Sequence, residues 1–163
     1  MGVFYKSERV GLNGKHFFLL KFRTMREGMH GGTPTAAGDD PRLTKIGRWL
    51  RKTKLDELPT LYNVLQGDLS LVGPRPDVPG EIESLDPSTR RICLSVRPGI
   101  ISPATLWDMN EDEYLKGAAD PHQKYCDEIK PIKYKMNVEY VQNKSFLGDL
   151  KIIGQYLWKI LKK

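Results

Sequence analysis

The dipeptide Asn13-Gly14 constrains the fold more than any other feature, because it favours the tight turn that joins two antiparallel strands. The segments on either side, residues 3–5 and 16–22, are rich in the β-branched and aromatic residues typical of strands. Residues 3–26 are therefore predicted to form a β-hairpin. Residues 26–40, rich in Gly, Thr and Pro, are predicted to form a loop, either an active-site flap or a plain surface loop.

Two segments have the pattern of basic amphipathic helices. In residues 42–54 apolar positions recur at helical spacing, and basic side chains occupy the other face. In residues 145–163 the predicted apolar face consists of Phe146, Leu150, Ile153, Leu157 and Leu161. Such helices often lie on anionic membrane surfaces, and a solvated charged face produces the same pattern.

The middle of the chain alternates short helical and strand-like segments. Residues 58–65 carry an apolar helical face, and Pro59 is tolerated in a first turn, which places Asp56 and Glu57 at the N-terminus of that helix. Residues 70–73 are predicted to form a short buried strand. The remaining predicted helices are residues 86–96 and residues 125–143, the second interrupted near Pro131. The prediction is one α/β domain over residues 1–163, mostly helical, with a short β-hairpin or sheet and amphipathic surface helices.

Charge and cysteine content narrow the possible partners. The net charge of +6 favours an anionic partner, while a nucleic-acid binder is not expected because no recognition motif accompanies the charge. Cys93 and Cys126 are far apart and form no metal-binding pair, which argues against a zinc site. The longest apolar run near the start, residues 17–20, is too short to span a membrane.

The adjacent carboxylates Asp56 and Glu57 are the first candidate for chemistry. Acids at a helix start have an ordinary explanation, because they cap free backbone N–H groups. Basic residues precede this pair, however, and a helix N-terminus also attracts phosphate. Acids flanked by bases, with few histidines, suit phosphate chemistry assisted by Mg²⁺, which prefers carboxylate and phosphate oxygens.

Two further segments present basic side chains. In Pro74-Arg75-Pro76 the prolines restrict the backbone, which would pre-organise a guanidinium for phosphate oxygens. A rigid turn with a surface arginine is the alternative. On a strand, Lys21 and Arg23 would share one face, with Phe22 on the other. This pattern fits either an anion-binding face or a solvated one.

Taken in chain order, these segments resemble the bacterial sugar transferases, the family of monotopic phosphoglycosyl transferases. The similarity lies in residues 7–11, 21–25, 55–59, 63–68 and 73–76, followed by Arg97-Pro98-Gly99. It extends from about residue 3 to the end of the chain and is most specific between Lys21 and Gly99.

The resemblance implies a two-step reaction. Asp56 would attack the β-phosphate of a UDP-sugar, forming a phospho-sugar intermediate and releasing UMP, and polyprenyl phosphate would then accept the phospho-sugar. Glu57 would position or deprotonate reacting groups, and Mg²⁺ would lie near Asp56. The substrate-binding residues implied are Lys21, Arg23, Arg51, Pro74, Arg75, Pro76 and Arg97. The implied location is the cytoplasmic face of the bacterial inner membrane, with peripheral or monotopic attachment.

The chain departs from the family pattern in two places. The N-terminal re-entrant membrane helix expected before the hairpin is not in this sequence, so the amphipathic helices would have to provide attachment. An inactive membrane-surface module that binds lipid or phosphate is therefore an alternative. After Arg97-Pro98-Gly99, residues 100–107 replace a Gly-rich stretch ending in Asn-Gly-Arg, and the expected basic residue has no counterpart.

Overall fold

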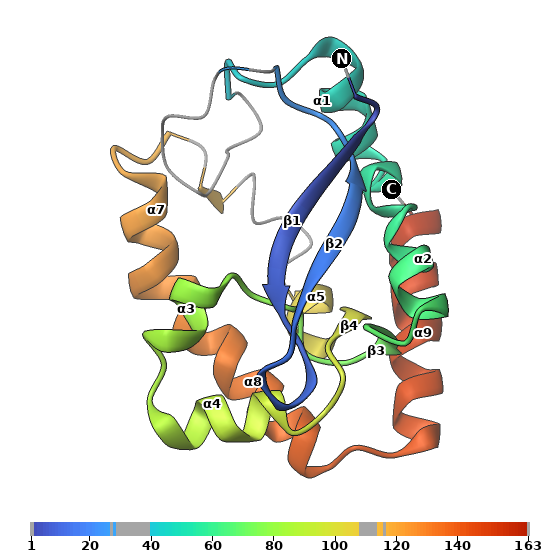
Figure 1. Ribbon diagram of the computed structural model, residues 1–163, viewed down its shortest axis with the longest axis vertical. Coiled ribbons are helices and arrows are strands. Elements are labelled where there is room, and N and C mark those ends of the chain that lie inside the picture. The colour runs from blue at the N-terminus through green and yellow to red at the C-terminus, as the bar shows by residue number, and fades with distance from the viewer. Residues whose placement is uncertain (1, 27, 29–39, 108–113, 116, 163) are drawn as a thin grey trace.

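The computed structural model describes residues 2–26, 28, 40–107, 114–115 and 117–162. A long β-hairpin crosses the molecule, with helices on both sides and a small parallel sheet near its turn (Figure 1). The predicted single, mostly helical α/β domain is confirmed. The loop predicted for residues 26–40 lies largely outside the described residues.

The predicted hairpin is confirmed. Strand β1 (Phe4–Val10) pairs antiparallel with β2 (His16–Phe22), with Phe4 opposite Phe22 and Val10 opposite His16. The connection contains the short 3₁₀ helix η1 (Leu12–Gly14). Asn13 and Gly14 both have positive φ, 55° and 79°, as a tight hairpin turn requires.

Helix α1 (Lys45–Lys52) is shorter than the predicted segment 42–54. Leu43 instead forms a β-bridge with Met25, and Lys54 has a left-handed φ of 58°, which ends the helix. Thr44 caps α1 by accepting a hydrogen bond from the Gly47 N–H at 2.8 Å. The backbones approach so closely that a Cβ on Gly47 would lie 2.0 Å from the Thr24 carbonyl oxygen. Gly47 thus lets α1 lie directly against the end of the hairpin.

The prediction that Asp56 and Glu57 begin the next helix was wrong by one turn. They lie in a separate 3₁₀ turn, η2 (Leu55–Glu57), and α2 (Thr60–Leu65) begins only after Pro59. The Thr60 hydroxyl donates a hydrogen bond to the Glu57 carbonyl oxygen at 2.6 Å, in place of a continuing helical N–H. The apolar positions of this segment face outward, since Thr60 and Asn63 are buried whereas four residues are exposed: Leu58, Leu61, Tyr62 and Leu65.

A parallel pair of short strands lies near the turn of the hairpin. The predicted strand near residue 70 is β3 (Ser70–Val72), which pairs with β4 (Gly99–Ile101). A Cβ on Gly99 would lie 2.1 Å from the Gly73 nitrogen, so this crossing also depends on glycine. The chain between them forms α3 (Pro79–Glu83) and α4 (Pro87–Leu94), the latter confirming the predicted helix, and α5 (Pro103–Trp107) follows β4. A hydrophobic cluster under the hairpin contains Phe17, Leu19 and Leu69, with Val64 and Ile100 packed against it.

The C-terminal part is helical, as predicted. Helix α7 (Pro121–Lys124), the π-helical turn η3 (Tyr125–Ile129) and α8 (Lys130–Gln142) are continuous, and the irregular turn ends two residues before Pro131. Helix α9 (Phe146–Leu161) follows, capped by Ser145.

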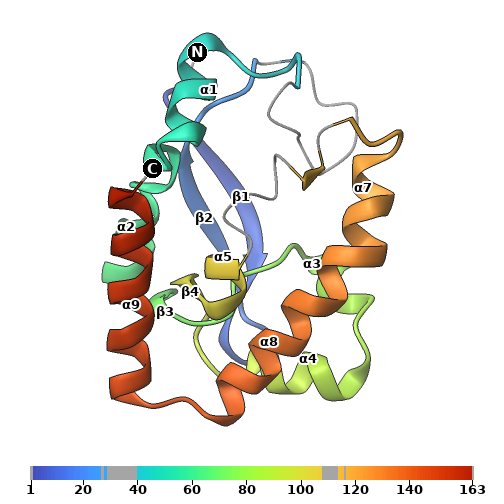
Figure 2. The ribbon, with the colours of Figure 1, turned by 180° about the vertical axis from the view of Figure 1, so that it is seen from behind.

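The two ends of this region lie on opposite sides of the hairpin. In Figures 1 and 2, α9 and α2 lie on one side of the hairpin, whereas α7 and α8 lie on the other side. In α9 the half-buried inward face includes Ile152, Ile153 and Tyr156. Of the predicted apolar face, Ile153 alone turns inward, and the other four residues are exposed: Phe146, Leu150, Leu157 and Leu161. No helix in the described ranges is long and apolar enough to cross a membrane.

Candidate active site

The turn η2 places the two adjacent carboxylates beside the hairpin. It lies between α1 and α2 and packs against β2. Asp56 is buried and Glu57 is partly buried, so neither is an ordinary surface acid. The alternative that these acids only cap a helix finds no support, because neither η2 nor α2 has a side-chain cap hydrogen bond.

Glu57 is the shared anion of two cations. Lys21 Nζ lies 2.8 Å from Glu57 Oε1. Arg75 donates from Nη1 to Oε2 at 3.3 Å and from Nη2 to Oε1. Burial alone would raise the pKa of Glu57, but the charges and hydrogen bonds of Arg75 and Lys21 outweigh it and hold the pKa far below its usual value. Glu57 is therefore ionised and fixed in place.

Asp56 differs from its neighbour in having no such partners. Within the described residues it accepts no side-chain hydrogen bond and forms no ion pair. Burial and the negative charge of Glu57 raise the pKa of Asp56, while the charges of Lys21, Arg51 and Lys54 oppose the increase. The site therefore combines one neutralised carboxylate with one that is available for chemistry.

Other predicted residues are arranged around this pair. Arg51, in the last turn of α1, donates from Nε to the Thr24 hydroxyl at 3.2 Å, and its charge acts on Asp56. Pro74 and Pro76 are buried, whereas 41% of the Arg75 side chain is exposed. The prolines thus anchor the segment and leave part of the guanidinium open to a ligand.

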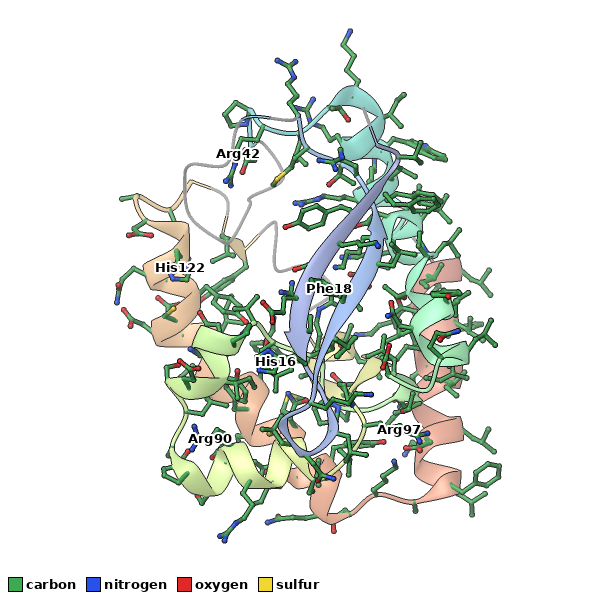
Figure 3. All side chains as sticks on the ribbon, in the orientation of Figure 1. His16, Phe18, Arg42, Arg90, Arg97 and His122 are labelled. Carbon is green, nitrogen blue, oxygen red and sulfur yellow. The ribbon has the colours of Figure 1, made fainter. Side chains whose placement is uncertain are left out.

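Two predicted substrate-binding residues lie elsewhere. Arg23 donates from Nε to the Gly2 carbonyl oxygen at 2.9 Å and from Nη2 to that of Phe4, which ties the strand to the N-terminal backbone. Arg97 is exposed and lies toward the lower end of α9 (Figure 3). Among the described residues, no hydrogen bond or ion pair connects either arginine to Asp56 or Glu57.

Three residues at the site were not proposed from sequence. The charge of Arg9 acts on both Glu57 and Asp77. Asp77 lies directly after the Pro-Arg-Pro segment, and its charge acts on Arg75. Burial and the charge of Glu57 raise the pKa of Tyr156, which lies on the inward face of α9. Arg9 could have been proposed from sequence, because it belongs to the family-like motif of residues 7–11. The position of Tyr156 could not, because it depends on how α9 packs.

The oxygen ligands of the site suit a hard cation that is held partly by substrate. Across the described residues, no group of three or more acids, histidines or cysteines forms a metal cage. Mg²⁺ usually binds one or two carboxylates together with substrate phosphates. The unpaired carboxylate of Asp56 fits that kind of site.

Comparison with known proteins identifies the family. The model for bacterial sugar transferases matches residues 1–163. The chain is 40% identical over 159 residues to EpsL, an uncharacterized sugar transferase of Bacillus subtilis (strain 168), covering 98% of this chain and 70% of EpsL. It is 38% identical over 161 residues to galactosyl transferase CpsE of Streptococcus agalactiae serotype III (strain NEM316), covering 91% of this chain and 32% of CpsE.

The name of a third relative includes a lipid phosphate, undecaprenyl phosphate. The chain is 34% identical over 160 residues to an undecaprenyl-phosphate glucose phosphotransferase of Komagataeibacter xylinus, covering 93% of this chain and 28% of the relative. The chain thus spans about a third of CpsE and most of EpsL. The match along its whole length, together with the paired carboxylates and their cations, shows that this chain belongs to the bacterial sugar transferase family.

Proposed function

We propose that this protein transfers a phospho-sugar from a UDP-sugar to polyprenyl phosphate through a covalent intermediate on Asp56. The observation that carries the proposal is that the two carboxylates differ in their ion pairs. Glu57 is neutralised by Lys21 and Arg75, and Asp56 has no bonded partner among the described residues. A carboxylate nucleophile needs a free oxygen, and Asp56 provides one.

The first step exchanges one phosphorus–oxygen bond for another. An Asp56 oxygen attacks the β-phosphorus, the bond from that phosphorus to the bridging oxygen breaks, and UMP leaves with the bridging oxygen. In the second step an oxygen of polyprenyl phosphate attacks the same phosphorus, and the bond to Asp56 breaks. The products are the polyprenyl diphosphate sugar and a free carboxylate. With a dianionic acceptor, charge and protons balance without an external acid or base.

The surrounding cations lower the barrier to attack by an anion on an anion. The charges of Lys21 and Arg51 act on Asp56, and those of Arg75 and Lys21 act on Glu57, which supports a role in offsetting the repulsion and stabilising the spread charge of the transition state. Glu57 is a poor proton acceptor, because its pKa is so low. This favours a role in positioning Lys21 and Arg75 near Asp56 over one in deprotonating a substrate.

Magnesium fits the same arrangement. Asp56 and the substrate diphosphate would hold Mg²⁺, which supplies Lewis-acid stabilisation of the phosphate oxygens when bound. The UDP-sugar would be oriented by Lys21 and Arg75, because their ion pairs with Glu57 fix both side chains before the substrate binds.

The exposed apolar side of the molecule supports attachment to a lipid surface. Helices α2 and α9 lie on the same side of the hairpin, and both expose apolar residues, among them Leu61, Leu65, Leu157 and Trp158. Lysines such as Lys151 are exposed on the same helix α9, as is typical of helices that bind anionic membranes. The cytoplasmic face of the bacterial inner membrane, where nucleotide sugars occur, is the location we infer.

The test is UMP release from a panel of UDP-sugars with Mg²⁺, with and without detergent-solubilised undecaprenyl phosphate. Asp56→Asn should lose turnover by about 10³-fold or more, as expected for a nucleophile. The control is Glu83→Gln, an exposed acid in α3, which should leave turnover unchanged. Turnover that survives in Asp56→Asn contradicts the covalent mechanism. Tight vesicle binding without UMP release under any condition would favour the inactive lipid-binding module instead.

A further inference from the structure

Three carboxylates act on Arg75, those of Glu57, Asp77 and Asp56, and it pairs with Glu57. Both terminal nitrogens of its guanidinium donate to Glu57. The charge of Asp77, two residues further along the chain, also acts on Arg75. Within the described chain, however, no ion pair joins Arg75 to Asp77. Since a guanidinium with several anions nearby can bind any of them, a restraint on Asp77 helps to keep Arg75 on Glu57.

Asp77 is held by helix α8. The hydroxyl of Tyr134 donates a hydrogen bond to Asp77 Oδ2 at 2.7 Å, and the Val10 N–H donates to the Asp77 backbone oxygen at 3.0 Å. Lys130, one turn before Tyr134, forms an ion pair with Glu81 in α3. These contacts fasten α8 to the chain that follows Arg75, so the carboxylate of Asp77 is fixed both through its backbone and through its side chain.

The surroundings of Asp77 explain why losing the hydrogen bond from Tyr134 would affect the neighbouring charges. Asp77 and Tyr134 are both half-buried and line one small cavity, where screening by water is weak. The other charges that act on Asp77 are those of Arg9 and Glu81. If Tyr134 could not donate, the Asp77 carboxylate would have to find another donor, and Arg75 is one of the two neighbouring cations.

We propose that Tyr134 is a positioning residue of the transferase: its hydroxyl holds Asp77 and thereby keeps Arg75 on Glu57, beside the attacking carboxylate. The consequence for turnover rests on the proposed function, whereas the effect on the Arg75–Glu57 pair does not. The sequence gives no hint of this role, because Tyr134 and Asp77 are 57 residues apart in the chain.

The first experiment measures the pair without any substrate. The coupling between Arg75 and Glu57 is obtained from the unfolding free energies of Arg75→Met, Glu57→Gln and the double variant. We expect this coupling to fall by at least half in a Tyr134→Phe background and to return when Asp77→Asn is added, because the competing charge is then gone. An unchanged coupling in Tyr134→Phe, or no recovery with Asp77→Asn, overturns the proposal.

The control is Tyr140→Phe. It removes a similar bond from the same helix, since the Tyr140 hydroxyl donates to Asp149 Oδ1 at 2.8 Å, away from Arg75. This variant should lower stability and leave the Arg75–Glu57 coupling as in the wild type. A coupling that falls equally in both tyrosine variants would mean that general loosening of α8 is responsible, and would also overturn the proposal.

The second experiment measures UMP release. Tyr134→Phe should lower kcat about tenfold with little change in KM, because the charged groups are misplaced rather than lost. Adding Asp77→Asn should restore most of kcat. A purely structural role predicts the opposite, a further fall in the double variant. If the wild type releases no UMP, the proposed function fails, and the coupling measurement still decides whether Tyr134 positions Arg75.

Discussion

Replacing Glu57 by Gln removes the anion that Lys21 and Arg75 share, at nearly constant size. The exposed fractions of the three side chains are 18% for Glu57, 19% for Lys21 and 41% for Arg75. Removing one partner of a buried pair costs about 3–5 kcal/mol, and an exposed pair contributes about 1 kcal/mol or less. Because Arg75 is partly exposed, we expect an intermediate loss of about 2–3 kcal/mol in the free energy of unfolding.

Thermal unfolding followed by circular dichroism measures this loss. In a domain of this size 1 kcal/mol corresponds to about 2–4 °C, so Glu57→Gln should melt about 5–10 °C below the wild type at pH 7. The exposed acid Glu83 provides the control, and Glu83→Gln should change stability by no more than about 0.5 kcal/mol.

The pH dependence has a definite sign. The pKa of Glu57 is depressed in the folded protein, so its contribution is complete above its ordinary value of 4.5 and is lost as pH falls toward the folded value. The difference between wild type and Glu57→Gln should therefore be largest near neutral pH and shrink below pH 4.5. Wild-type stability of the variant at pH 7, or a difference that grows in acid, would refute the ion-pair argument.

Three further predictions concern packing, pH and the lipid surface. Gly47→Ala should destabilise by about 3 kcal/mol in urea unfolding, because its Cβ would lie 2.0 Å from the Thr24 carbonyl oxygen; Gly154→Ala in α9, where a Cβ meets nothing within 4 Å, should be neutral or stabilising, and equal effects would contradict the close packing. The acid limb of kcat/KM should lie above pH 3.8, the ordinary carboxyl value, since burial and Glu57 raise the pKa of Asp56; a limb below that value would exclude Asp56 as the titrating group. Leu61→Asp combined with Leu157→Asp should weaken sedimentation with anionic vesicles at least about tenfold, whereas Ile132→Asp on α8 should not, and identical losses would remove the α2–α9 side as the lipid contact.

Local sequence signals determined much of the fold. Asn13-Gly14 fixed the hairpin because both residues adopt positive φ, which few other dipeptides accept. Asp86-Pro87 and Ser145 marked helix starts that the structure confirms as capping positions. Such features depend on a few neighbouring residues, so they can be recognised in the chain alone.

The sequence by itself also pointed to Asp56, Glu57, Lys21 and Arg75 as residues of one site, through the family-like motifs and the clustering of acids and bases. Only the tertiary structure decided that Glu57 takes both cations while Asp56 stays unpaired, because Lys21 is 36 residues away in sequence and Arg75 is 18. It likewise turned Leu61, Tyr62 and Leu65 of α2 outward and brought the Tyr134 hydroxyl to Asp77. Helical periodicity shows that a face is apolar, but which side meets the core depends on long-range packing that no local pattern records.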